Sequence, residues 1–167
     1  MRDSVIALAE CLDLAIEVQE RMLGCLQTQR RAIIAADHAE IEAAATEMEG
    51  ELLRLGGIES NRTRLAAELA DELGVVAARW SAIREGLETY EREYLGERVA
   101  RVEELVRDLE LHNTINGQLI GNELELVDVS IRTLASGDAQ ASTRAYTSRG
   151  DASAPAPANP VLLNLAA

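Results

Sequence analysis

Apolar residues recur every three or four positions through most of the chain, and this spacing is the period of an amphipathic α-helix. It predicts a first long helix over residues 4–35, with the serine at its start as the N-cap. A second long helix is predicted over residues 37–73, because Asp37 and Glu40 have the spacing of a capping box and Gly74 suits a C-cap. Two adjacent glycines inside this helix are expected to weaken or bend it.

The pattern predicts a shorter helix or connector over residues 75–87 and a final long helix over residues 91–134. Steps of four and three from Leu95 to Leu134 pass through twelve positions, of which eight are apolar, so the final helix carries a seam like that of a coiled coil. Beyond residue 120 the apolar stripe moves by one position. This shift indicates that the last third of the helix packs differently, or on something else.

Amides and glycines interrupt this seam. Asn113 and Asn116 occupy positions where leucine is expected, and Gly117 and Gly121 follow on the same side. A polar residue in a seam lowers stability but fixes helix register by pairing with another polar group, and glycine lets another backbone approach. Two interpretations are open: a polar layer inside the protein's own bundle, or a helix that leaves part of its stripe for a partner helix.

The composition of the chain changes after residue 137. The helical part contains no proline, whereas residues 138–167 are small and polar, hold all three prolines and end in the apolar run VLLNLAA. We therefore predict a helical domain over residues 1–137 and a disordered tail over residues 138–167, with Tyr146 as the only aromatic residue of the tail.

Hydrophobic residues make up 47% of the chain, but aromatic residues only 2%, and phenylalanine is absent. A core of small and branched side chains is typical of packed helices rather than of a sheet. The predicted fold class is all-α: an elongated antiparallel helical bundle or coiled coil of three long helices plus a short one.

The formal net charge is −13, and most of it lies in residues 36–137, where 22 acidic residues stand against ten arginines. Such a surface repels phosphate, so nucleic acid and anionic membranes are poor candidates for partners. The charged N-terminal stretch is neither a signal peptide nor a membrane span, and no apolar run is long enough to cross a bilayer. We interpret the protein as cytoplasmic.

No set of residues indicates catalysis or metal binding. His38 and His112 have no cysteine or acidic partner at ligand spacing, and no phosphate-binding loop or nucleophile–base set is present. Cys11 and Cys25 lie fourteen residues apart on one predicted helix, about 21 Å by helical rise, so they cannot bridge within it and are expected to be free and buried. We therefore expect no enzyme activity, no cofactor and no metal.

Five segments together resemble the FlgN family of flagellar export chaperones: LRLGG, RTRLAAELADELG, LELHNTINGQLI, LELVDVSIRTL and AYTSRGD. The family pattern has a leucine, two asparagines three apart and a Leu-Leu or Leu-Ile pair on the last long helix, followed by Tyr-x-x-x-Gly. The resemblance covers about residues 4–150. In this sequence the pattern falls on Leu109, Asn113, Asn116, Leu119, Ile120, Tyr146 and Gly150.

The resemblance implies a cytoplasmic type III export chaperone. Such a protein binds the C-terminal helical segments of hook–filament junction (hook-associated) proteins, prevents their aggregation and delivers them to the export gate. Tyr146 matches the family's tail tyrosine, which implies docking on the cytoplasmic domain of the gate, and the export ATPase is a further candidate partner. An exposed apolar stripe suits a client helix, and we nominate for it Leu119, Ile120, Leu124, Val127, Ile131 and Leu134.

Two other classes of protein are open. A self-associating structural coiled-coil or scaffold protein, including a homodimer, would use the same stripe. A histidine phosphotransfer protein is more distant, because His112 is followed by a glycine but no lysine exists in the chain. A chaperone should form a complex of defined ratio with a client, whereas a scaffold should oligomerise alone.

Overall fold

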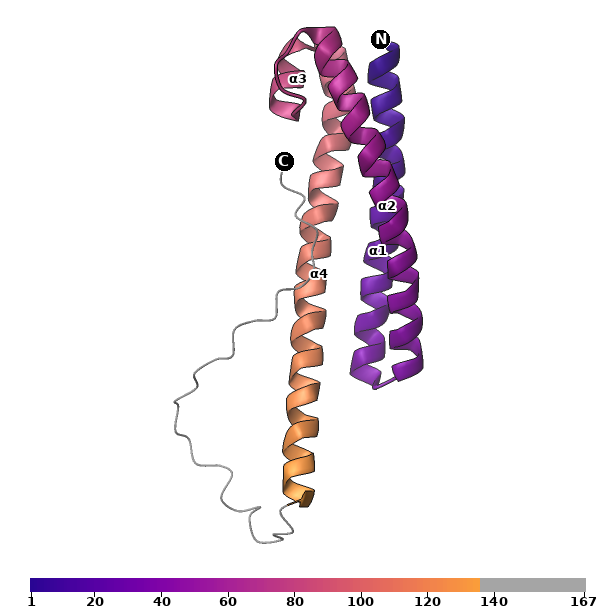
Figure 1. Cartoon of the computed structure of the whole chain (residues 1–167), viewed down its shortest axis with the longest axis vertical. Helices are drawn as coiled ribbons and strands as arrows, with labels where there is room; N and C mark the ends of the chain where they lie inside the picture. Colours follow the sequence, from indigo (N-terminus) through magenta and orange to yellow (C-terminus); the bar gives the residue numbers. More distant parts are fainter. Residues whose placement is uncertain (136–167) are drawn as a thin grey trace, which may run out of the picture. The chain divides into compact units, whose positions relative to one another are not determined.

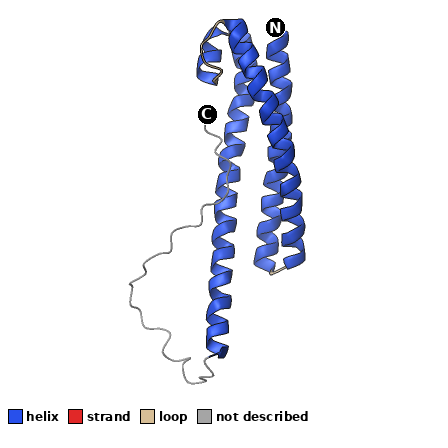
Figure 2. Cartoon of the chain, viewed as in Figure 1, coloured by secondary structure: helices blue, strands red, loops and turns tan. Residues whose placement is uncertain are grey.

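The computed structural model describes the backbone of residues 1–135 and the side chains of residues 1–132, and its regular elements there are all helices (Figure 1, Figure 2). The predicted all-α fold of three long helices and one short helix is confirmed. The predicted boundary at residue 137 and the tail beyond it lie outside this part. In chain order the helices are α1 (Asp3–Ala35), α2 (His38–Leu73), α3 (Trp80–Gly86) and α4 (Thr89–Ala135).

The chain divides within α4 into two compact units, Met1–Leu126 and Val127–Ala167. The first unit contains α1, α2, α3 and most of α4. Two residues connect α1 to α2 and reverse the chain into an antiparallel hairpin (Figure 1). Ala36 adopts the left-handed conformation, with φ 54°. Asp37 then caps α2, because its Oδ1 accepts a hydrogen bond of 3.1 Å from the backbone N–H of Glu40. The predicted role of Asp37 is therefore confirmed.

The end of α2 also follows the prediction. Gly74 adopts a left-handed conformation with φ 68°, and the backbone N–H of Val75 donates to Ala70 O at 3.0 Å. This cap turns the chain out of the helix, so residues 75–79 are not helical and α3 begins only at Trp80. The segment predicted as a shorter helix or connector therefore consists of a connector over residues 75–79 followed by the short helix α3. The glycine pair inside α2 does not interrupt it.

Ser4 does not cap α1, and this prediction was wrong. The helix begins one residue earlier, and Ser4 Oγ donates a hydrogen bond to a carboxylate oxygen of Glu72 on α2. Arg2 holds the N-cap position, and its backbone N–H donates to Glu91 Oε1 on α4 at 3.0 Å. Polar contacts to distant parts of the chain therefore fix the start of α1.

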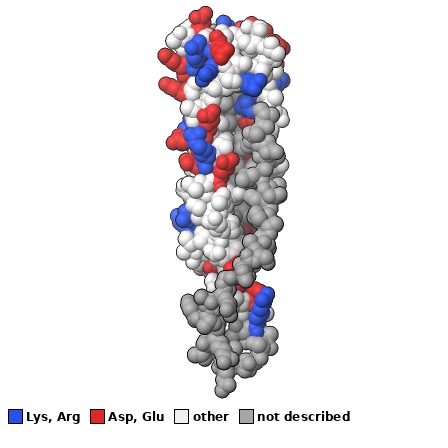
Figure 3. Space-filling model, turned by 90° about the vertical axis from the view of Figure 1, so that its left-hand side faces the viewer, with Lys and Arg blue, Asp and Glu red and all other residues white. Residues whose placement is uncertain are grey.

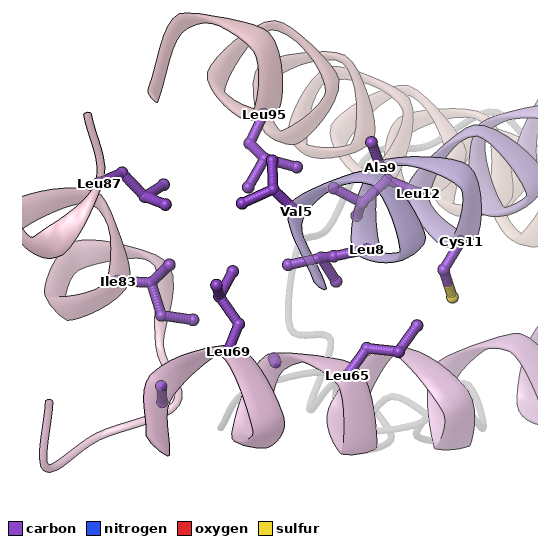
Figure 4. Packing of buried hydrophobic residues seen from close by; sticks show 12 residues of the cluster. Val5, Leu8, Ala9, Cys11, Leu12, Leu65, Leu69, Ile83, Leu87 and Leu95 are labelled. Atoms are coloured by element: carbon purple, nitrogen blue, oxygen red, sulfur yellow. The ribbon is translucent and has the colours of Figure 1, made fainter. Parts of the chain in front are cut away.

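The main apolar core lies where the first turns of α1 and α4 meet the end of α2 and α3 (Figure 4). Leu69 of α2 and Leu95 of α4 are both 0% exposed and pack with Val5 of α1. A smaller second cluster joins α1 to α2 farther along, and Leu109 packs against it from α4. The other members of the main core are Leu8, Ala9, Cys11, Leu12, Leu65, Ala66, Ala70, Ile83 and Leu87.

The buried stripe of α4 differs from the predicted seam at Leu105. Leu105 is fully buried, whereas its neighbour Val106, which the four-three count selects, is only half-buried. Leucine is the larger of the two side chains, so its burial removes more apolar surface from water. The most buried residues of α4 are Glu91, Leu95, Leu105 and Asn116, and Val99 and Val102 also pack against the main core. The predicted seam therefore contains positions 95, 99, 102 and 116 but misses 91 and 105.

Two glycines of α2 should respond in opposite directions to alanine. Gly74→Ala is expected to lower the free energy of unfolding by about 1 kcal/mol, because an L side chain at φ 68° is strained. Gly56→Ala is the matched control and should raise it by about 0.5–1 kcal/mol, because Gly56 is inside the helix and no atom lies within 4 Å of an added Cβ. Urea denaturation measures both. Equal effects of the two substitutions would contradict the assigned end of α2.

Candidate partner-binding surface

The distal part of α4 exposes apolar side chains over several turns. Leu119 is half-buried, and every other residue from 117 to 132 is exposed. Leu124 and Ile131 are 65% and 59% exposed, in contrast to Leu95 near the start of the same helix. Exposed large apolar residues that cluster in this way make this segment a candidate site of interaction.

The exposure follows from the lengths of the helices. Asn116 of α4 is bonded to Gln29 of α1, 87 residues earlier in the chain. Both helices rise about 1.5 Å per residue, so Ala35 at the end of α1 is level with about residue 122 of α4. Beyond that level α1 has no residue left to cover α4.

Four exposed apolar residues form a row along the distal helix, which we call the distal row: Ile120, Leu124, Val127 and Ile131. Their four-three spacing keeps them on one side of a helix. Leu126 and Val129 are also exposed, 62% and 60%, on the opposite side. The single apolar stripe predicted from the sequence does not include this second pair.

Asn116 is 2% exposed and joins α4 to the end of α1. Its Nδ2 donates to the backbone carbonyl of Leu26 at 2.9 Å and to Gln29 Oε1 at 3.0 Å, while its Oδ1 is buried without a hydrogen-bond partner. A polar layer of this kind specifies register at the expense of stability. We call the Gln29–Asn116 pair the amide clasp.

The other residues of the amide-and-glycine segment have different environments. Asn113 is half-buried, and no hydrogen bond from it to α1 is observed in residues 1–132. Gly117 and Gly121 have no atom within 4 Å of an added Cβ, so they serve no close approach of a backbone inside the described chain. A backbone that approaches these glycines closely would therefore have to belong to a partner.

Charged groups of both signs lie between the apolar side chains. Figure 3 shows carboxylates and guanidinium groups interspersed over the described part of one face. On distal α4 itself, Asp128 and Arg132 form an ion pair of 2.6 Å, beside Glu123 and Glu125. The distal row is therefore an apolar strip with a charged border, as in helices that bind other helices.

The described residues offer little to covalent or metal chemistry. No group of three or more potential metal ligands gathers among them. Cys11 and Cys25 are free and buried, as expected, and burial raises the pKa of each thiol, with Glu47 adding to the effect at Cys25. Among these helices, none has an apolar run of the length that a bilayer crossing requires.

Two predicted site residues cannot be placed. Tyr146, the residue predicted to dock on the export gate, lies outside the described residues. The side chain of Leu134, the last residue nominated for the client, is outside them as well, although its backbone belongs to α4. The structure brings the other five nominated residues, Leu119, Ile120, Leu124, Val127 and Ile131, onto the distal half of one helix.

The fold is a helical hairpin with a longer helix, α4, and the distal part of that helix is apolar and exposed. These features are those of a protein that binds helical partners. A family model described as FlgN protein matches residues 1–154, so the chain belongs to the FlgN family of flagellar export chaperones, as the sequence predicted. This is a family of chaperones and not a family of enzymes. No curated protein and no solved structure matches the chain.

Proposed function

We propose that this protein binds the C-terminal helical segments of hook–filament junction proteins, prevents their aggregation and delivers them to the flagellar export gate. Membership of a family of flagellar export chaperones supports the proposal. The observation that carries the proposal is the exposure of the distal row on α4, from Ile120 to Ile131. An export chaperone acts before its client is exported, so we place it in the cytoplasm.

The distal row has the chemistry that an amphipathic client helix needs. Its four-three repeat matches the spacing of apolar residues on one side of a helix, which docks by placing anchors at i, i+3 or i+4 and i+7. Each side chain of the row is partly exposed, and covering it contributes on the order of 1 kcal/mol. Such a complex is specific but reversible, and a chaperone that must release its client requires both properties.

Further partners follow from the same proposal. Tyr146 is the residue that we assign to docking on the cytoplasmic domain of the export gate, because an aromatic anchor contributes much of the energy of a small interface. The export ATPase is a further candidate partner. Asn113 and Asn116 are assigned to the register of the seam, and the contacts of Asn116 support this role.

Size-exclusion chromatography with light scattering tests the proposal. The full chain is measured alone and then with each hook–filament junction protein of the same genome. A complex of defined ratio with one of them is expected. If the protein instead forms large assemblies alone and binds no junction protein, the distal row joins copies of this chain, and the scaffold or homodimer function replaces ours.

A further inference from the structure

We propose that the contact between α1 and α4 opens at its distal end, where the amide clasp lies, and that opening extends the client-binding surface to Leu105 and Leu109. The identity of the client rests on the proposed function, whereas the opening concerns this chain alone. The occupant of the opened seam is the amphipathic client helix, which replaces α1 as the partner of these two leucines.

The proximal end of the contact is firmly held. Leu95 is fully buried in the main core. Glu91 is 1% exposed, and its carboxylate accepts hydrogen bonds from the backbone N–H and the guanidinium of Arg2. Apolar burial combined with a charge-assisted hydrogen bond resists separation, so this end serves as the pivot.

The middle of the contact combines apolar packing with surface ion pairs, because Val99 and Val102 of α4 pack against the main core. Arg98 Nε lies 2.9 Å from Asp13 Oδ1 without hydrogen-bond geometry. Arg101 donates to Glu20 Oε1 at 2.7 Å, and both of these side chains are more than 40% exposed. Exposed pairs of this kind add little stability, because water competes for both charges.

The distal end of the contact is polar and incompletely bonded. The amide clasp takes the place of an apolar pair, and Asn116 Oδ1 is buried without a partner. His112 Nδ1, about one turn earlier on α4, is also buried without a hydrogen-bond partner. Buried acceptors without donors weaken a contact, so α4 is held least where the distal row begins.

Opening joins covered and exposed apolar residues into one surface. Leu105 is fully buried and Leu109 is half-buried against the second core cluster, so neither can meet a client while α4 lies on α1. Both precede the distal row on the hairpin-facing side of α4. The α1–α2 hairpin has apolar contacts of its own in both clusters, so it can persist while α4 moves.

A measurement without client tests the opening. Spin labels at Gln27→Cys and Thr114→Cys report the distal end, and labels at Glu10→Cys and Glu97→Cys report the proximal end, all at exposed positions. The full chain carries alanine in place of its two native cysteines. Pulsed dipolar spectroscopy should show a second, longer distance for the distal pair only, and Asn116→Leu should remove it. One narrow distance for both pairs would overturn the proposal.

A bridged variant tests the link to binding. Gln29→Cys/Asn116→Cys, in the same cysteine-free background, is joined by a short bismaleimide, and its affinity for the client is compared before and after bridging. Bridging should weaken binding at least tenfold, whereas capping the same two cysteines with N-ethylmaleimide, which modifies both thiols without joining the helices, should not. Equal affinity before and after bridging would overturn the extended surface. If the unbridged protein binds no junction protein, the proposed function fails, and the spin labels still decide the opening.

Discussion

Leu124→Asp/Ile131→Asp is expected to weaken binding of a junction-protein segment by about 100-fold or more, with no change in Tm. Both side chains are exposed, so the folded chain loses little when they become carboxylates. In the complex the same carboxylates lose their hydration because an apolar helix covers them. A cost of about 1.4 kcal/mol for each carboxylate gives a tenfold loss of affinity per site. Isothermal titration of wild type and variant measures the effect.

The matched control adds the same charge on the other side of the helix. Gln118→Asp/Asn122→Asp introduces two carboxylates at exposed positions that face away from the distal row. Its affinity for the client should stay within about threefold of wild type, because surface charges far from an interface act only through screened fields. An equal loss in both variants would mean that negative charge, not the distal row, determines binding.

Arg2→Ala is expected to lower the free energy of unfolding by about 3 kcal/mol. Glu91 is 1% exposed, and without the guanidinium its carboxylate keeps only the hydrogen bond from the backbone N–H of residue 2. Removing one partner of a buried ion pair costs about 3–5 kcal/mol, and the lower value applies because Arg2 itself is about one-third exposed. Urea denaturation followed by circular dichroism measures the change.

A second substitution separates the pair from the packing around it. Glu91→Gln removes the charge, so in the Arg2→Ala background it should restore about 1–2 kcal/mol of the loss. Glu91→Gln alone should cost less than Arg2→Ala, because the guanidinium keeps solvent and Glu72 as partners. If the two losses simply add in the double variant, the two groups do not interact, and the pivot that we assign to this end of α4 is wrong.

Features that depend on neighbouring residues were predictable from the sequence. The cap at Asp37 and the end of α2 at Gly74 require only a side chain and a backbone geometry within one turn. The helical period likewise predicts three long helices and one short helix. Ser4 resembles such a local cap, but its partner is Glu72, 68 residues later, so no local pattern reveals its role.

Features that depend on the pairing of distant helices were less predictable. A four-three count cannot choose between Leu105 and Val106, because both flank the same seam. The sequence marks Asn116 as a polar interruption of its stripe, but only the packing of α1 beside α4 places its amide against that of Gln29. Leu126 and Val129 are exposed on the side of α4 opposite the distal row, and a single-stripe count passes over them.

Hydrogen–deuterium exchange of the full chain, alone and with its junction-protein client, tests the central claim most directly. Amides of exposed helical segments exchange through local opening, which a bound helix suppresses. The account predicts that the client slows exchange in residues 117–132 of α4 and leaves the middle of α2 unchanged. A complex that protects α2 or α3, and leaves residues 117–132 as they are in the free protein, would contradict it.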